Sequence, residues 1–338
     1  MKPFDHFKHF ETHHCETGSM RHIYVHNDHP LSEELLFGLG EGLGFIYWHQ
    51  KGQPPFIGGR AMPNPSIEEL AGLRTGVKVV PYTTSSARKA ESTLLNYLEA
   101  KTPMMLQVDM GYLPYFDFDG NEYHFGGHVV VACGYDAESR QVLIADRDAD
   151  LHIVSWDDLS KARNSKFKPF SPQNRWFTFD FTHKRLPTTD EIYTAIHHQI
   201  EVMLNPPISN MGVKGIRKTA KLMPEWKNSM SQDDLKWSLF NTYIFISADG
   251  GSGGGIFRYM FGRFLAESAE LTGNKDLIDC AEQFRLVGDE WDAIGKWCLE
   301  MSKTPTGDLM GVREMLNRVA DMEEQAWLHL RQSVVVAE

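Results

Sequence analysis

The fold of the first half of the chain depends on one stretch, GGHVVVACGYDAESRQVLIAD, which spans residues 126–146. The β-branched run after His128 predicts a strand, and the run that ends at Asp146 predicts its antiparallel partner beyond a polar turn. If the turn centres on residue 137 or 138, His128 faces Asp146 directly or one pair further along the same face. Side chains opposed in this way have Cβ atoms about 4.5–5.5 Å apart, so the carboxylate is expected to hold the imidazole.

Cys15 is the third member of this candidate site. It precedes Glu16-Thr17-Gly18-Ser19-Met20-Arg21, a plausible helix start, and helix amides and a nearby imidazolium both favour the thiolate form of a cysteine. A thiol, a base and a group that orients the base are the set needed for nucleophilic catalysis. The cysteine comes early and the histidine and aspartate come more than a hundred residues later, which is the papain-like order. The alternative is a small buried Cys15 and a structural His128.

Composition excludes several classes of protein. The 338 residues suffice for two domains with full cores, and a net charge of −11 argues against nucleic acid as a partner. The four cysteines (Cys15, Cys133, Cys280 and Cys298) have the spacing of neither a disulfide framework nor a metal site. We predict no metal and no cofactor. Without a secretory signal or an apolar run of membrane-spanning length, a cytoplasmic location and no membrane contact are expected.

The order of the elements predicts an α+β layer fold followed by a helical half. A helix is expected from Ser32 to Phe45, and its glycines are expected to approach the helix of Cys15. The other elements expected in the first half are strands beginning at Ile57, at 78–82, 104–109 and 175–181, and helices opening at Ser66, at 91–101 and at Trp156. A loop over 111–127, rich in aromatic residues, leads into His128 and is a candidate wall of the active site.

A domain boundary is predicted near residues 182–188, where a polar segment ends in Pro187. The predicted domains are therefore residues 1–182 and 183–338. Thr188 or Thr189 is expected to cap the first helix of the second domain. Further helices are expected at 233–247, 254–271, 275–301 and 307–335, with Gly273 ending one of them.

The glycine loop DGGSGGG, residues 249–255, opens onto one of these helices. Glycines let the backbone approach a ligand, and free amides at a helix start attract anions. The candidate substrate-binding residues of the loop and its helix are Gly251, Ser252, Gly253 and Arg258. No Gly-Lys-Ser/Thr follows, so the loop is not a Walker motif. The alternative is a flexible or tightly packed turn between two helices.

Three segments together resemble a known family: HCETGSMR at 14–21, LSEELLFGLGEGLGF at 31–45, and GHVVV at 127–131 with Asp146. They resemble the N-terminal domain of the butirosin biosynthesis protein H family. The second half, with its glycine loop, resembles the helical domain often fused to it. The string Ser-Glu-x-x-x-Phe-Gly-Leu-Gly is the most specific part of the match.

The resemblance implies a papain-like fold used for acyl transfer in secondary metabolism. The named member of that family moves an acyl group from a carrier-protein thioester to an aminoglycoside amine. Carried over by motif, Cys15 is the acyl-accepting thiol, His128 the base and Asp146 the orienter, and Glu33 matches an acidic position beside the active site. The implied partners are an acyl carrier protein and a small-molecule amine, with self-association of the chain left open.

One departure concerns the oxyanion site. Papain-like enzymes commonly carry a glutamine a few residues before the cysteine, whereas residues 8–14 contain none. The Cys15 amide is therefore expected to act with a second donor from His9, His13 or His14.

Three other functions compete with acyl transfer. A cysteine peptidase or amidase would use the same three residues with water as the acceptor. A metal protein would use the histidines crowded at the N-terminus, of which His22 and His26 have helical spacing. A non-catalytic binding module would keep the fold without a reactive thiol, and fast alkylation of Cys15 by iodoacetamide would exclude it.

Overall fold

The structure, a computed structural model, describes residues 1–50, 52–118, 120, 123–168, 170–304 and 309–334. These fall into two compact units. Unit 1 comprises residues 1–36 and 75–186, and unit 2 comprises residues 37–74 and 187–338. The chain is thus an α+β region with an antiparallel sheet, followed by a largely helical region, as the pattern of elements predicts. The domain limits 1–182 and 183–338 remain a prediction, and residues 37–74 group with the helical half.

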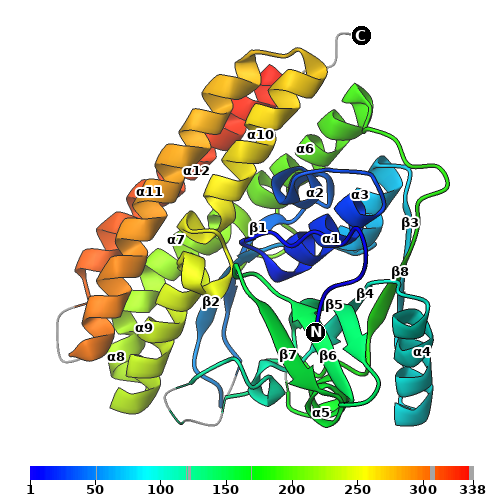
Figure 1. Ribbon diagram of the computed structural model, residues 1–338. Helices are drawn as coiled ribbons and strands as arrows, with labels where there is room; N and C mark the ends of the chain where they lie inside the picture. Colours follow the sequence, from blue (N-terminus) through cyan, green and yellow to red (C-terminus); the bar gives the residue numbers. More distant parts are fainter. Residues whose placement is uncertain (51, 119, 121–122, 169, 305–308, 335–338) are drawn as a thin grey trace. The chain divides into compact units, whose positions relative to one another are not determined.

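Unit 1 is built on a six-stranded antiparallel sheet, ordered β3-β8-β4-β5-β6-β7 (Figure 1). The strands are β3 Lys78–Tyr82, β4 Met104–Val108, β5 His128–Asp136, β6 Gln141–Ala145, β7 Leu151–Ser155 and β8 Trp176–Asp180. The first seven residues of β5 are all buried. A strand of this kind must be covered on both faces, which agrees with its continuous β-branched run.

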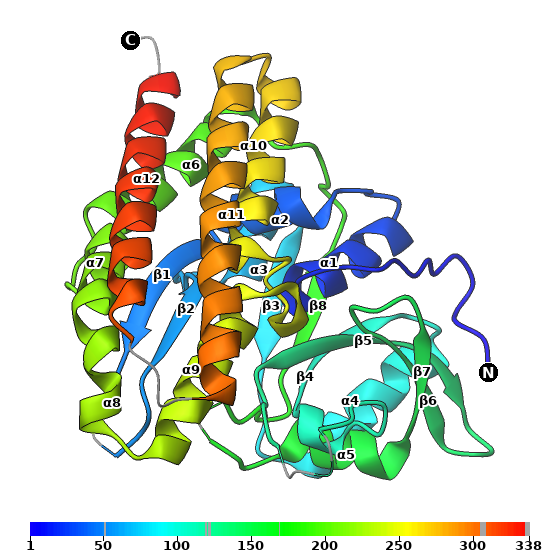
Figure 2. The ribbon, with the colours of Figure 1, turned by 90° about the vertical axis from the view of Figure 1, so that its left-hand side faces the viewer.

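Helices cover both faces of this sheet. They are α1 Cys15–His26, α4 Ala87–Glu99 and α5 Trp156–Asn164, with a short 3-10 turn η1 at Met110–Tyr112. Leu94 and Leu159, from α4 and α5, share one core with Val130 and Ile144 of the sheet. Figure 2 shows α1 on the other side of the sheet from α4 and α5. The nucleophile candidate therefore begins a helix that lies directly against the sheet, packed on β5.

Unit 2 holds a two-stranded antiparallel sheet and most of the helices. Its elements are β1 Leu43–Trp48, β2 Phe56–Arg60, α3 Ile67–Arg74, α6 Thr189–Leu204, α7 Gly212–Leu222, η2 Met223–Glu225, α8 Trp226–Ser229, α9 Gln232–Ile246, η3 Ala248–Gly250, η4 Gly255–Phe257, α10 Arg258–Thr272, α11 Asp276–Lys303 and α12 Gly311–Ser333. Thr188 caps α6 through a full capping box with Glu191, as predicted. No described helix has the length and apolar character needed to cross a membrane. Parts of the helix predicted at 307–335 lie outside the described residues.

The helix predicted from Ser32 to Phe45 is wrong in its second half. Helix α2 spans only Glu33–Leu39, and the chain then enters β1. A Cβ at Gly44 would lie 2.9 Å from the backbone nitrogen of Ala61, so this glycine serves strand pairing. Within unit 2, Gly38, Gly42 and Gly44 face Phe264, Phe37 and Ala61 respectively. The expected approach of these glycines to the helix of Cys15 remains a prediction.

Candidate active site

His128 and Asp146 meet at one end of the β5–β6 hairpin. His128 is the first residue of β5, Asp146 directly follows β6, and both side chains are buried. The His128 Nε2 lies 2.7 Å from the Asp146 Oδ2. The register pairs Val131 with Ala145, so continuing it by one residue sets Val130 opposite Asp146. His128 is two residues from Val130 along β5, so its side chain lies on the same face of the sheet as that of Asp146, one cross-strand pair away. This is the second of the two predicted arrangements.

The electrostatics of this pair favour opposite charges. Burial alone would lower the pKa of His128, but the charge and hydrogen bond of Asp146, together with the Cys15 thiol, raise it above its usual value. Burial alone would raise the pKa of Asp146, but His128 and the Tyr115 hydroxyl lower it. The carboxylate is thus ionised at neutral pH, and the imidazole readily accepts and keeps a proton.

Cys15 completes the arrangement. It is the first residue of α1, is partly buried and carries a free thiol. A hydrogen bond between its thiol and His128 contributes to the raised pKa of the imidazole. Because Asp146 occupies Nε2, Nδ1 is the ring nitrogen left for the thiol. The structure thus brings all three predicted residues together within unit 1.

The segment before Cys15 is tied to the end of β6. The Thr12 amide donates to the Arg147 carbonyl oxygen at 2.8 Å, and the His9 Nε2 lies 3.4 Å from the Asp146 carbonyl oxygen. These contacts fix the entry into α1 relative to the hairpin. They explain how residues more than a hundred positions apart in sequence come to share one site.

Glu33 contacts the backbone of His13 and His14, which directly precede Cys15. Its buried carboxylate accepts the His13 amide at 2.9 and 3.1 Å and the His14 amide at 3.2 Å. Burial and Glu34 raise its pKa to about 7, while the two amides act in the opposite direction. The predicted contact of Glu33 with substrate remains a prediction, since the neighbours observed here are backbone donors. The backbone amides of His13 and His14 are engaged by Glu33, so a second oxyanion donor from either residue would have to be its side chain. The Cys15 amide as oxyanion donor remains a prediction.

The aromatic loop supplies a part of the site that sequence analysis did not assign. The Tyr115 hydroxyl donates to the Asp146 Oδ2 at 2.8 Å, and the Phe116 ring meets the His128 ring edge-on at 5.6 Å between centroids. The predicted wall at 111–127 is therefore in contact with the His128–Asp146 pair. Its aromatic content and its position before His128 were the available signals, but they could not single out Tyr115.

Arg258, a predicted substrate-binding residue, lies in the interior of unit 2 and is completely buried. Its Nε donates to the Glu323 Oε1 at 2.6 Å, and its Nη1 donates to the Gly44 carbonyl oxygen at 3.0 Å. The Glu323 carboxylate also accepts from the indoles of Trp291 and Trp327. These partners tie four separate elements of unit 2 together.

The glycine loop uses its amides within the protein. The Gly254 amide donates to the Ser252 Oγ at 3.1 Å, and the Gly255 amide donates to the Asp292 Oδ1 at 2.7 Å. The assumption that these amides are free is therefore wrong for these two residues. Gly251 and Gly253 adopt positive φ, which explains their residue type. Binding of substrate by the loop remains a prediction.

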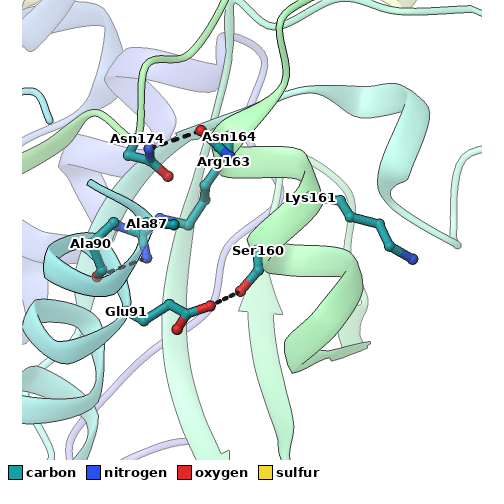
Figure 3. Close-up of a pocket in the computed structure, with 8 residues that line it drawn as sticks. All are labelled: Ala87, Ala90, Glu91, Ser160, Lys161, Arg163, Asn164 and Asn174. Atoms are coloured by element: carbon teal, nitrogen blue, oxygen red, sulfur yellow. Dashed lines mark hydrogen bonds between the residues drawn. The ribbon is translucent and has the colours of Figure 1, made fainter. Parts of the chain in front are cut away.

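Two further features of unit 1 lie outside the Cys15–His128–Asp146 arrangement: a cluster of possible metal ligands and a cavity. Among the described residues, one group of metal-ligand type combines His13, Glu33 and Glu34, whose donor atoms lie within 4.8 Å of one another. The predicted alternative pair, His22 and His26, is not part of it, and the His22 Nε2 is engaged by the Phe10 backbone. A cavity of about 200 Å³ lies between α4 and α5, and none of the candidate site residues lines it. Figure 3 shows the side chains that line this cavity.

The fold and the site define an α+β protein with a thiol, an imidazole and a carboxylate in contact. Residues 14–147 match the family model described as Butirosin biosynthesis protein H, N-terminal, and residues 157–330 match a Domain of unknown function (DUF4872). The chain therefore belongs to the family in which these two domains follow one another, as the resemblance predicted. No curated protein matches the chain.

Proposed function

We propose that this protein is a thiol-dependent acyltransferase of papain-like type. It takes an acyl group from a carrier-protein or CoA-type thioester, holds it on Cys15 and passes it to the amine of a small molecule. The observation that carries the proposal is the position of His128, whose ring is bonded to Asp146 and also interacts with the Cys15 thiol. The family description, which names butirosin biosynthesis, supports an acyl donor and an amine acceptor from antibiotic biosynthesis.

The first half of the reaction forms the acyl-enzyme. His128 takes the proton of Cys15, and the thiolate attacks the carbonyl carbon of the donor thioester. The tetrahedral oxyanion is stabilised by the Cys15 amide and a second donor. When it collapses, the carbon–sulfur bond to the donor breaks, and the departing thiol leaves with the proton from His128. Asp146 stays ionised throughout and stabilises the imidazolium.

The second half transfers the acyl group. The acceptor amine attacks the acyl-Cys15 carbonyl while His128 removes a proton from the nitrogen. The carbon–sulfur bond to Cys15 then breaks, and His128 returns the proton to the thiolate. Water in place of the amine would give hydrolysis, so a peptidase or amidase shares every residue of this scheme. The acceptor alone distinguishes the two reactions.

Intact-mass measurement after incubation with a panel of acyl thioesters tests the proposal. The wild type should gain one acyl mass that maps to Cys15 and is lost when an amine is added. Cys15→Ala should gain none while keeping its fold, since the substitution is small, and His128→Ala should acylate far more slowly at neutral pH. Asp146→Asn should fall between the wild type and His128→Ala, because the imidazole loses its orientation.

Three outcomes would contradict parts of the proposal. Turnover by a folded Cys15→Ala protein would exclude the thiol mechanism. Loss of the acyl group to water, with no amine product across a range of amines, would make the protein a hydrolase. Slow alkylation of Cys15 by iodoacetamide, no faster than that of the buried Cys133, would favour a non-catalytic binding module.

A further inference from the structure

Tyr115 and His128 share one oxygen atom of Asp146. The Tyr115 hydroxyl donates to Oδ2 at 2.8 Å, and the His128 Nε2 lies 2.7 Å from the same atom. The other oxygen, Oδ1, accepts the Arg147 amide at 2.8 Å. A buried carboxylate held by three donors has little freedom to rotate away from the imidazole. Tyr115 is the one of these donors that comes from outside the hairpin.

A second histidine–aspartate pair, His152 and Asp148, contacts the ring of Tyr115. The His152 Nε2, on β7, lies 2.9 Å from both oxygens of Asp148. The His152 ring stacks on the Tyr115 ring, with centroids 3.8 Å apart and planes 14° apart. The Tyr115 ring thus rests on one histidine–aspartate pair, while its hydroxyl bonds to the aspartate of the other.

The loop that carries Tyr115 is anchored at both ends. The buried Asp109 accepts the amide of Gly111 at 3.0 Å and that of Phe125 at 3.1 Å through its Oδ1. Its Oδ2 lies 2.9 Å from the His124 Nδ1. The backbone on either side of Tyr115, at Gly111 and at Phe125, is therefore hydrogen-bonded to one carboxylate that directly follows β4.

We propose that Tyr115 is a positioning residue of this site, holding Asp146 on His128 with its hydroxyl while its ring is supported by the His152–Asp148 pair. The inference rests on the proposed function only in that the site is taken to be the reactive one. A phenylalanine would keep the ring contact but leave a buried carboxylate oxygen with one donor fewer. Burial and the nearby charge of Asp146 raise the pKa of Tyr115 well above its usual value, so the hydroxyl remains a donor.

The titratable and charged groups around Asp146 come from several elements. The titratable and charged residues that face it or its hydrogen-bond partners are Cys15, His9, His22, Tyr115, His128, Arg147, Asp148 and His152. The Tyr115 hydrogen bond is one of the contributions that lower the pKa of Asp146. Without this hydrogen bond, Asp146 is held less firmly on the imidazole and stabilises the imidazolium less, so the thiolate of Cys15 should form only at a higher pH.

The test is the pH profile of Cys15 alkylation by iodoacetamide, with acylation measured in parallel. Tyr115→Phe should move the acid limb upward by about one pH unit, the size expected for the loss of a hydrogen bond to a charged group. Tyr112→Phe is the matched control, because it removes a hydroxyl from the same loop at a ring that contacts His124. The control profile should coincide with that of the wild type, and both variants should melt as cooperatively as the wild type.

A second variant tests the support from β7. His152→Ala removes the ring under Tyr115 and should move the limb in the same direction by a smaller amount. The double variant Tyr115→Phe/His152→Ala should shift the limb no further than Tyr115→Phe alone, because His152 acts through the hydroxyl. Additive shifts would overturn the role given to the His152–Asp148 pair.

The inference and the proposed function fail in different ways. If wild-type Cys15 acylates and the Tyr115→Phe profile coincides with the wild-type and Tyr112→Phe profiles, Tyr115 is not a positioning residue although acyl transfer stands. If no thioester acylates Cys15 but the alkylation limb moves as expected, the acyltransferase proposal is wrong and the role of Tyr115 at the thiol site stands.

Discussion

At the scale of single residues, Glu33 provides a test that depends on proton binding. Burial and the neighbouring Glu34 raise its pKa to about 7, from an ordinary value of 4.5. Between these two values the folded state keeps a proton that the unfolded state has released. The free energy of unfolding of the wild type should therefore fall as the pH rises from about 4.5 to about 7, by up to roughly 3 kcal/mol.

Comparison with Glu33→Gln isolates this contribution, because glutamine does not titrate. The difference in unfolding free energy between the two proteins, measured by urea denaturation at several pH values, should change across that window and be flat above it. A difference that stays constant from pH 4.5 to 7 would mean that the His13 and His14 amides keep the pKa of Glu33 near its ordinary value.

Among the residues of the site, one contact could be predicted from the sequence and others could not. Alternate side chains of a strand point to the same face of the sheet, so the common face of His128 and Asp146 could be predicted without a structure. The bond from Tyr115 to Asp146 depends on how a loop folds over a sheet end, and the contacts of Glu33 depend on a chain reversal between α1 and α2. Neither leaves a periodic signal in the sequence.

At the scale of elements, strands and helices with clear caps or alternation were predicted well, and transitions within glycine-rich segments were not. The bounds of β3 match the prediction, and α6 begins at its predicted cap. The passage from α2 to β1 was missed, because glycines lower helix propensity without showing which element replaces the helix. Strand β7 and helix α7 were also not predicted.

Gly255 offers an element-scale prediction about the start of α10. It has φ of +54°, and a Cβ there would lie 2.7 Å from the Gly288 Cα. Gly255→Ala should lower the free energy of unfolding by more than about 2 kcal/mol, because steric overlap with the backbone adds to the cost of a left-handed conformation. Urea denaturation measures it.

Gly273→Ala is the matched control for this substitution. Gly273 ends α10 with φ of +74°, and no atom lies within 4 Å of the position of its Cβ. Its cost should be limited to the backbone conformation, about 1 kcal/mol. Equal losses for the two variants would show that the contact with Gly288 relaxes freely and that close packing is not the reason for a glycine at 255.

At the scale of the whole molecule, the sequence predicted the order of the two halves and their classes. It did not predict that residues 37–74 would join the helical half. That grouping depends on long-range contacts such as the one between Arg258 and the Gly44 carbonyl oxygen. Local patterns carry no information about which distant helix an element will pack on, so compact units are harder to predict than elements.

Substitution of Arg258 in unit 2 should change the free energy of unfolding but not the reactivity of Cys15 in unit 1. Arg258→Gln would leave the completely buried Glu323 without its cation. The free energy of unfolding should fall by about 3–5 kcal/mol, the usual cost of breaking a buried ion pair from one side. The alkylation rate of Cys15 and the KM for the acyl donor should be unchanged in the folded protein, because the observed contacts of Arg258 lie within unit 2.

Arg217→Gln is the control for loss of a charge. Arg217 also pairs with two carboxylates, those of Asp321 and Glu324, but its side chain is 36% exposed. Its removal should cost no more than about 1 kcal/mol, since water replaces the lost partners. If Arg258→Gln instead kept its stability and raised the KM for the donor, Arg258 would be a ligand-binding residue, as the glycine loop beside it first suggested. Differential scanning calorimetry and donor-dependent acylation rates on the same three proteins distinguish the two roles.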